Sequence, residues 1–160
     1  MVDSTLVGSV PAMKIGGAHE VAVGATAERC MAIILDVPAY REWWPGVTES
    51  QVLAAGEQPE VRLVFDSHAP GIGAIELLAR LEPHPPSSVG IGLMGGRLKK
   101  LTGPGWTLTD DDGTGCRVRY EIQAEMDTGL PGFMEKPFAE PAKRFLVTEP
   151  VEALKRRAES

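Results

Sequence analysis

A change in hydrophobic period constrains the fold of this chain more than any other feature. From about residue 49 to Met126, apolar and polar residues alternate with a period of two, which is typical of antiparallel strands that bury one face. The segment from Cys116 to Met126 shows this most clearly, because its even positions are apolar and its odd positions are polar or charged. After Gly129 the apolar residues recur at helical spacing instead. The sequence therefore predicts an antiparallel sheet followed by a long helix.

Turn-forming residues divide the sheet region into short strands. Gly95-Gly96 predicts a hairpin turn, and Gly103-Pro104-Gly105 predicts a bulge within a strand. An earlier segment also alternates, from His19 to Val23, and ends at Gly24. The seven predicted strands comprise residues 19–23, 49–55, 61–68, 75–81, 89–93, 98–109 and 116–126. Because the connections between the last six are short, we expect them to form a meander.

Two short helices are predicted between the first and second strands. Thr26 can accept a hydrogen bond from the first turn of a helix at about residues 27 to 35. Pro38 suits the first turn of a second helix, which carries Trp43 and Trp44.

A long C-terminal helix is predicted from an apolar stripe that includes Phe138 and Phe145. Prolines complicate it, since a proline in a helix interior removes a hydrogen bond and costs about 3 kcal/mol. We expect the regular part of the helix to begin near Pro141 and to kink around Pro150.

The length and the pattern together indicate one domain. A chain of 160 residues fits a single hydrophobic core. We assign residues 14–160 to one α+β domain, and residues 1–13, which have no sustained period, to a loose N-terminal lead-in. The expected architecture is a curved seven-stranded antiparallel sheet wrapped around the C-terminal helix.

Charge and cysteine content exclude several classes of protein. The net charge is −6 and no basic stripe with interleaved aromatic residues is present, so we expect no nucleic acid partner. No apolar run approaches the roughly 20 residues of a membrane-spanning helix and no secretion signal is evident, so we expect a cytoplasmic protein without stable membrane insertion. Cys30 and Cys116 belong to no metal-ligand or CxxC motif. We expect buried free thiols rather than a disulfide, and no metal or cofactor.

The ratio of sheet to helix predicts a hollow. One long helix cannot easily fill the space over a seven-stranded sheet unless large side chains help, and only 6% of the residues are aromatic. Apolar hollows with a few polar groups are the usual sites for small molecules. We therefore expect a ligand cavity between the sheet and the C-terminal helix.

Four segments carry motifs of a known family. They are residues 36–46, 105–108, 115–120 and 129–133, the first of which reads DVPAYREWWPG. Their order and spacing resemble the START-like (SRPBCC) superfamily, and within it the bacterial polyketide cyclase/dehydrase and lipid transport family. The resemblance implies a helix-grip fold with a deep apolar pocket that holds a lipid, polyketide, isoprenoid or similar ligand under the C-terminal helix.

The candidate pocket residues come from the inward face of the sheet and from the helix. The predicted ligand-binding residues are Phe65, Leu77, Leu93, Trp106, Tyr120, Ile122 and Met126 on the sheet, and Phe138 and Phe145 on the helix. Tyr120 is the best polar candidate, because a buried hydroxyl without a partner costs about 1 to 3 kcal/mol. Its partner is either a protein group or a ligand.

The tryptophans and histidines allow alternative interpretations. Trp43 and Trp44 either anchor the short helices to the sheet, which we favour, or form the mouth of the pocket. Trp106 can face either side of its strand. Of the histidines, only His19 shares a face with apolar neighbours and can point inward, as an acid–base group or as a histidine with a protein partner.

Polar catalytic groups are scarce among these residues. We therefore predict binding or transport of an apolar small molecule and assign no catalytic residue. The alternative is a polyketide cyclase or dehydratase that uses the same cavity, with Tyr120 and His19 as the first candidates for proton transfer.

Overall fold

The computed structural model describes residues 13–67, 72–111, 113–129 and 131–160. Residues 1–12, which make up most of the expected lead-in, lie outside the described residues. Met13 belongs to the first strand.

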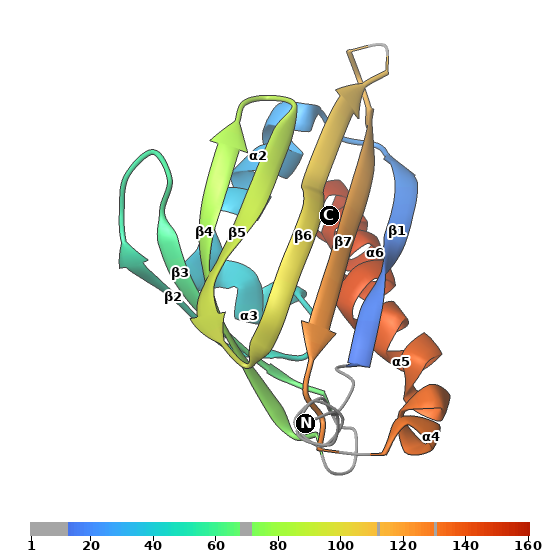
Figure 1. The fold of residues 1–160 in the computed structure, drawn as a ribbon. Coiled ribbons are helices and arrows are strands. Elements are labelled where there is room, and N and C mark those ends of the chain that lie inside the picture. The colour runs from blue at the N-terminus through green and yellow to red at the C-terminus, as the bar shows by residue number, and fades with distance from the viewer. Residues whose placement is uncertain (1–12, 68–71, 112, 130) are drawn as a thin grey trace.

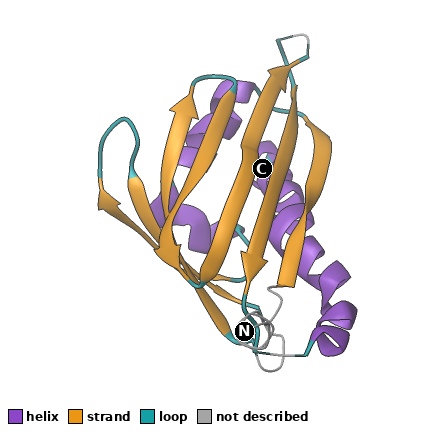
Figure 2. Cartoon of the chain, in the orientation of Figure 1, coloured by secondary structure: helices purple, strands orange, loops and turns teal. Residues whose placement is uncertain are grey.

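A curved antiparallel sheet forms one layer of the molecule, and the helices lie together on one of its faces (Figures 1 and 2). The strands are β1 Met13–Val23, β2 Val47–Ala54, β3 Glu60–Asp66, β4 Ala74–His84, β5 Ser88–Gly96, β6 Leu98–Asp110 and β7 Cys116–Met126. Their order in the sheet is β1-β7-β6-β5-β4-β3-β2. The predicted seven-stranded antiparallel meander is confirmed, with β1 completing the sheet beside β7.

Strand β1 begins earlier than the sequence pattern predicts. It pairs with β7 without interruption, from Met13 opposite Met126 to Val23 opposite Cys116. Its first half contains Gly16-Gly17-Ala18, which offers no contrast between polar and apolar residues. Pairing with a long neighbour, rather than local pattern, therefore sets the start of this strand.

The turn between β5 and β6 lies one residue beyond the predicted position. Gly95 and Gly96 both pair with β4, and Arg97 forms the turn. Gly96 has a φ of 98°, and a Cβ atom there would lie 2.3 Å from the carbonyl oxygen of Glu76. Only glycine fits this close approach to β4. Gly96 therefore serves a contact between two strands, and the hairpin turn follows it.

The predicted bulge in β6 is confirmed, and β6 separates from β5 next to it. The register against β7 shifts between Thr102 and Gly105, and Pro104 has no N–H to donate to a ladder. Among the described residues, β5 and β6 are paired at two positions only, Ser88 with Thr107 and Val89 with Trp106. Residues 90–96 of β5 are therefore paired on the β4 side alone.

The two short helices predicted between β1 and β2 are confirmed. They are α2 Ala27–Leu35 and α3 Tyr40–Trp43, and the 3₁₀ turn Val37–Ala39 lies between them. Thr26 caps α2, since its side chain accepts a hydrogen bond of 3.2 Å from the backbone N–H of Arg29.

The C-terminal helix consists of short pieces followed by one regular segment. The pieces are α4 Gly132–Glu135, a 3₁₀ turn Lys136–Phe138, α5 Ala139–Lys143, a π-helical turn Arg144–Thr148 and α6 Glu149–Glu159. The regular segment α6 begins at Glu149, later than the predicted start near Pro141. Short helical pieces already begin at Gly132, because Pro137 and Pro141 sit in the first turns of separate pieces, where their missing N–H groups are not needed. A π-helical turn ends just before Pro150, the position of the predicted kink, and gives room for a proline that cannot bond to the carbonyl of Leu146.

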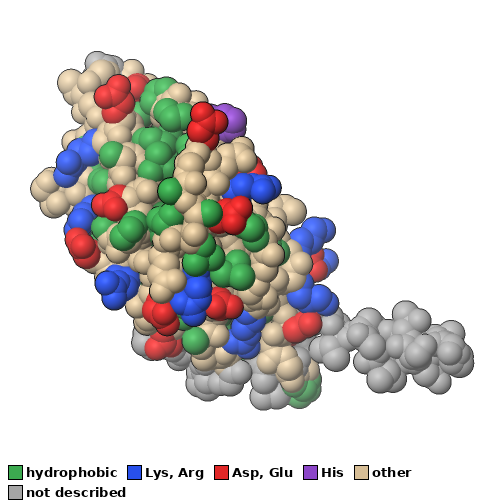
Figure 3. Space-filling model, turned by 90° about the vertical axis from the view of Figure 1, so that its left-hand side faces the viewer, with side chains coloured by type: hydrophobic (Ala, Val, Ile, Leu, Met, Phe, Trp, Pro, Cys, Tyr) green, Lys and Arg blue, Asp and Glu red, His purple; other side chains and the backbone are tan. Residues whose placement is uncertain are grey.

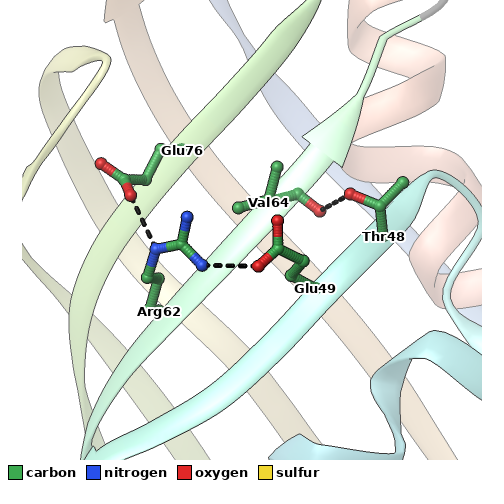
Figure 4. A network of polar contacts seen from close by, with 5 residues as sticks. All are labelled: Thr48, Glu49, Arg62, Val64 and Glu76. Atoms are coloured by element: carbon green, nitrogen blue, oxygen red, sulfur yellow. Dashed lines mark hydrogen bonds and ion pairs between the residues drawn. The ribbon is translucent and has the colours of Figure 1, made fainter.

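The outer face of the sheet carries charged side chains beside apolar ones such as Val64 and Leu78. Arg62 lies between two carboxylates of the neighbouring strands, with N–O distances of 2.9 Å to Glu49 and 2.7 Å to Glu76 (Figure 4). On the side that carries the β2–β3 hairpin, hydrophobic side chains gather along the middle and charged ones surround them (Figure 3). Val52 and Leu53 of the edge strand β2 are 41% and 55% exposed.

No helix in the described parts of the chain is long and apolar enough to span a membrane.

Candidate functional site

A pocket lies between the inner face of the sheet and the C-terminal helix. Strands β3 to β7 supply most of its wall, α3 and the residue after it add Tyr40 and Trp44, and the π-helical turn adds Leu146. The space between the wall atoms amounts to about 660 Å³ when the open mouth is included.

Five of the nine predicted residues line this first pocket. They are Phe65, Leu77, Trp106, Tyr120 and Ile122. Three more, Met126, Phe138 and Phe145, line a second pocket under α5, where the space between the wall atoms, open solvent included, is about 430 Å³. The two pockets share Ile75 and Leu146, so they adjoin at the π-helical turn. Whether these residues contact a ligand remains a prediction.

Leu93 lines neither pocket. It is half-buried and packs against the core, whereas Ile91, two residues earlier on the same strand face, lines the first pocket. The alternation placed Leu93 on the correct face, but it could not show that β5 diverges from β6 at this point. Ile91 was missed for the same reason.

A less buried part of the first pocket's wall lies beside the unpaired stretch of β5 and β6. Ile91, Leu98 and Leu101 line the pocket there and are only half-buried. Leu98 and Leu101 lie opposite Met126 and Ala124 of β7, which are fully buried, so all of these side chains belong to the inner face. Alternation along β6 could have identified the two leucines.

Aromatic rings crowd the inner part of the pocket. Trp106 and Tyr120 stack with ring centroids 4.3 Å apart and planes at 30°. Trp44 stands at 88° and 89° to these two rings, with centroid distances of 6.0 and 6.4 Å. Phe65 packs edge-on against Trp44 at 5.8 Å. Edge-to-face pairs of this kind contribute about 0.5 to 1.5 kcal/mol beyond their buried area, so they fix the ring positions.

The two tryptophans of the short helix differ in position. Trp44 is buried and lines the first pocket, while Trp43 is half-buried, packs against Tyr40 and lines neither pocket. Trp43 fits the favoured interpretation, in which the tryptophan anchors the short helices. Trp44 instead contributes to the wall of the pocket. The motif could not separate them because adjacent helical residues point in different directions.

The polar groups of the first pocket are few and uncharged. Among the described residues that line it, none is Asp, Glu, Lys, Arg or His. The hydroxyl of Tyr40 donates a hydrogen bond to the carbonyl of Ile34. The indole N–H of Trp44 is buried and has no acceptor.

Burial keeps both tyrosines protonated. It raises the pKa of Tyr120, and burial together with the nearby Tyr120 raises the pKa of Tyr40. At neutral pH each hydroxyl is therefore a hydrogen-bond donor and not a base.

His19 lies at the edge of the helix layer rather than in a pocket. Its Nε2 is 2.7 Å from Oε2 of Glu152 on α6, and neither pocket includes it. Of its two predicted interpretations, the structure supports a histidine with a protein partner.

The cysteines are buried free thiols. Their sulfur atoms lie 3.7 Å apart, between α2 and β7. Burial raises the pKa of Cys30 to about 12 and also raises the pKa of Cys116. Both side chains therefore stay protonated at neutral pH, and the reactive thiolate form is rare. No group of three or more His, Cys, Asp or Glu side chains in the described ranges is arranged to hold a metal ion.

The curved sheet, the short helices after β1 and the long C-terminal helical segment define a helix-grip protein of the START-like class. A model of the family described as polyketide cyclase / dehydrase and lipid transport matches residues 16–159, so the chain belongs to that family. The resemblance seen in the sequence motifs is thereby confirmed. A comparison with curated protein sequences finds no significant match.

Solved structures share this fold at low sequence identity. An aromatase/cyclase, ZhuI from Streptomyces sp. R1128, has a TM-score of 0.77 and 17% identity over 92% of this chain and 94% of that one. TTHA0849 from Thermus thermophilus has a TM-score of 0.75 and 18% identity, covering 91% and 97%. A STAR-related lipid transfer protein from Xanthomonas axonopodis has a TM-score of 0.70 and 19% identity, covering 89% and 85%. At these identities the likeness concerns the fold alone.

Proposed function

We propose that this protein binds or carries an apolar small molecule, such as a lipid, a polyketide or an isoprenoid, in the pocket between the sheet and the C-terminal helix. The observation that carries the proposal is the composition of the pocket wall, which is apolar and aromatic, with only hydroxyl and indole groups as polar side-chain atoms and no charge among the described residues. Such a wall gains free energy from burying apolar ligand surface, at roughly 25 cal/mol per Å².

The alternative proposal is a polyketide cyclase or dehydratase in the same pocket, and one of the solved neighbours is an aromatase/cyclase. Such a reaction needs a group that takes up or delivers a proton near neutral pH. The tyrosines have raised pKa values and His19 lies outside both pockets, bound to Glu152. These features favour binding over catalysis.

Titration with N-phenyl-1-naphthylamine, a neutral probe that fluoresces in apolar surroundings, tests the binding proposal. We expect saturable binding with one probe per chain. Ala124→Phe fills the first pocket and should abolish binding, because Ala124 lines the pocket and is fully buried. The matched control is Ala22→Phe, the same substitution at an exposed position of β1, which should leave binding unchanged.

Circular dichroism of both variants shows whether they remain folded, since an added ring in a packed core costs about 1 to 3 kcal/mol. Non-saturable binding to the wild type, or unchanged binding to folded Ala124→Phe, would contradict the proposal. Incubation with a candidate polyketone, followed by mass spectrometry of the products, tests the alternative.

A further inference from the structure

The two cysteines of the chain meet in the core, outside both pockets. Cys30 lies on α2 and Cys116 is the first residue of β7, 86 positions later, yet their sulfur atoms are 3.7 Å apart. Both residues are 0% exposed, and neither lines a pocket. The contact therefore joins two distant segments of the chain and has no part in the proposed ligand site.

Hydrogen bonds on either side of this contact hold α2 in place. The backbone N–H of Ala27 donates a bond of 3.2 Å to Oδ1 of Asp110, which lies directly opposite Cys116 in the ladder of β6 and β7. Nε of Arg29 donates a bond of 2.7 Å to the carbonyl oxygen of Ala158 on α6. The helix that carries Cys30 is thus fixed both to the hairpin that carries Cys116 and to the C-terminal helix.

A small movement separates this contact from a covalent bond. The sulfur atoms of a disulfide are about 2.0 Å apart, so the two thiols must approach by about 1.7 Å. Thermal motion displaces well-ordered atoms by about 0.5 Å along each axis, and rotation about the Cα–Cβ bond displaces a sulfur atom further. The pair therefore lies within reach of a disulfide.

We infer that Cys30 and Cys116 are a reversible disulfide site, which is reduced in this structure and which a small disulfide, such as oxidised glutathione, converts to a covalent link between α2 and β7. One cysteine thiolate attacks a sulfur of oxidised glutathione, forms a mixed disulfide and releases one glutathione. The second cysteine attacks the protein sulfur of the mixed disulfide and releases the other glutathione. Each cysteine sulfur loses one electron, each glutathione sulfur gains one, and the two thiol protons end on the two glutathione molecules.

The link should act on stability and not on the ligand site. It closes a loop of 86 residues that contains β2 to β6, and such a loop restricts the unfolded chain far more than the folded one. Because both thiols are buried, glutathione reaches them only while the chain folds or when α2 opens. Oxidation of the folded protein is therefore slow, and oxidation during folding is the main route.

Refolding in a glutathione buffer tests the site. The reduced full-length protein is diluted from 8 M urea into reduced and oxidised glutathione at pH 8, the free thiols are then alkylated, and mass spectrometry counts the added groups. We expect most refolded chains to carry neither an alkyl group nor a glutathione adduct. When 8 M urea is kept in the same buffer, the ratio of disulfide to dithiol should be at least about 30-fold lower, because the unfolded loop seldom brings its ends together.

The melting temperature of the two forms gives a second measurement. The oxidised form should melt about 4 to 16 °C above the reduced form, as closure of a long loop predicts for a chain of this size. Cys30→Ser is the control: it cannot form the link, so its melting temperature should be the same in both buffers. Cys116→Ser serves the same purpose if Cys30→Ser does not fold.

The outcomes that overturn the inference are distinct from those that test the proposed function. Two thiols that merely pack as small apolar side chains would give no internal disulfide after refolding, or an equal ratio with and without urea. A lower melting temperature of the oxidised form would show that the link distorts the fold. Both forms should bind N-phenyl-1-naphthylamine equally, and a loss of binding on oxidation would contradict a link that lies outside the ligand site.

Discussion

The two ends of the space between helices and sheet are built differently. At the end where α2 meets α6, the facing side chains Cys30, Ile34, Val151 and Leu154 are fully buried. At the end under α5 and the π-helical turn, Leu146 is only half-buried and two pockets adjoin. The same sheet and the same C-terminal helical segment therefore form a closed core at one end and an open pocket at the other.

The positions of the prolines account for this difference. After Pro150 the chain forms α6, an uninterrupted helix of 11 residues with a continuous apolar face. Before it, Pro137 and Pro141 divide the chain into pieces of five residues or fewer. Short pieces of changing pitch cannot present a continuous ridge of side chains to the sheet, so space remains between the layers.

Leucine truncation at the two ends should give the largest contrast. We expect Leu154→Ala to lower the free energy of unfolding by about 3 to 5 kcal/mol, because a fully buried leucine leaves a cavity. Leu146→Ala should cost about 1 to 2 kcal/mol, since its side chain already borders empty space. Urea titration of both variants measures the difference. Equal losses would mean that the two ends are packed equally well.

The reaction rate of the thiols tests how tightly the closed end is packed. With the pKa of Cys30 raised to about 12, its thiolate fraction at pH 8 is lower by about 1000-fold than that of an exposed cysteine. We expect a small disulfide reagent to modify the folded protein at least that much more slowly than the protein in 8 M urea. Rates within tenfold of each other would contradict tight packing at Cys30, and no reaction in urea would indicate a disulfide.

Phe145→Ala probes the boundary between the two pockets. The ring of Phe145 packs edge-on against Phe65 at 6.1 Å, where the pockets adjoin. We expect the affinity for N-phenyl-1-naphthylamine to fall about tenfold, as truncation of an aromatic contact at a binding site costs about 1 to 2 kcal/mol. Phe133→Ala is the matched control, because Phe133 is 79% exposed. If both variants bind like the wild type, Phe145 does not contribute to the site.

The smallest effect should come from the ion pair at the edge of α6. His19 and Glu152 are 31% and 41% exposed, and exposed pairs contribute roughly 0 to 1 kcal/mol. Glu152→Gln should therefore change the free energy of unfolding by less than about 1 kcal/mol. A loss above about 2 kcal/mol in urea titration would show that the pair, rather than apolar packing, holds α6 on β1.

Most of the fold could be predicted because period-two alternation is a local signal. The residues of β7 alternate without exception, and the structure pairs that strand along its whole length with β1. The alternation gave no prediction at Gly16 and Gly17, where polar and apolar residues cannot be distinguished. It was misleading at Gly96, where glycine allows the backbones of two strands to approach closely. These features depend on the neighbouring strand, which the local sequence does not contain.

The pocket could be predicted in part. Alternation identified the inner face, and with it Phe65, Leu77 and Tyr120. It could not identify Trp44, because the orientation of a short helix relative to the sheet depends on tertiary packing. It also placed Leu93 in the pocket instead of Ile91, since the divergence of β5 from β6 leaves no mark in the hydrophobic pattern.

The sparse pairing of β5 with β6 has a mechanical consequence. Strands β1, β7 and β6 form one hydrogen-bonded unit, and β2 to β5 form another, while the described residues join the two units at only two ladder positions and through the turn at Arg97. The first pocket draws its wall from both units. We therefore expect that a small rotation of one unit against the other changes the width of the pocket while breaking few ladder hydrogen bonds.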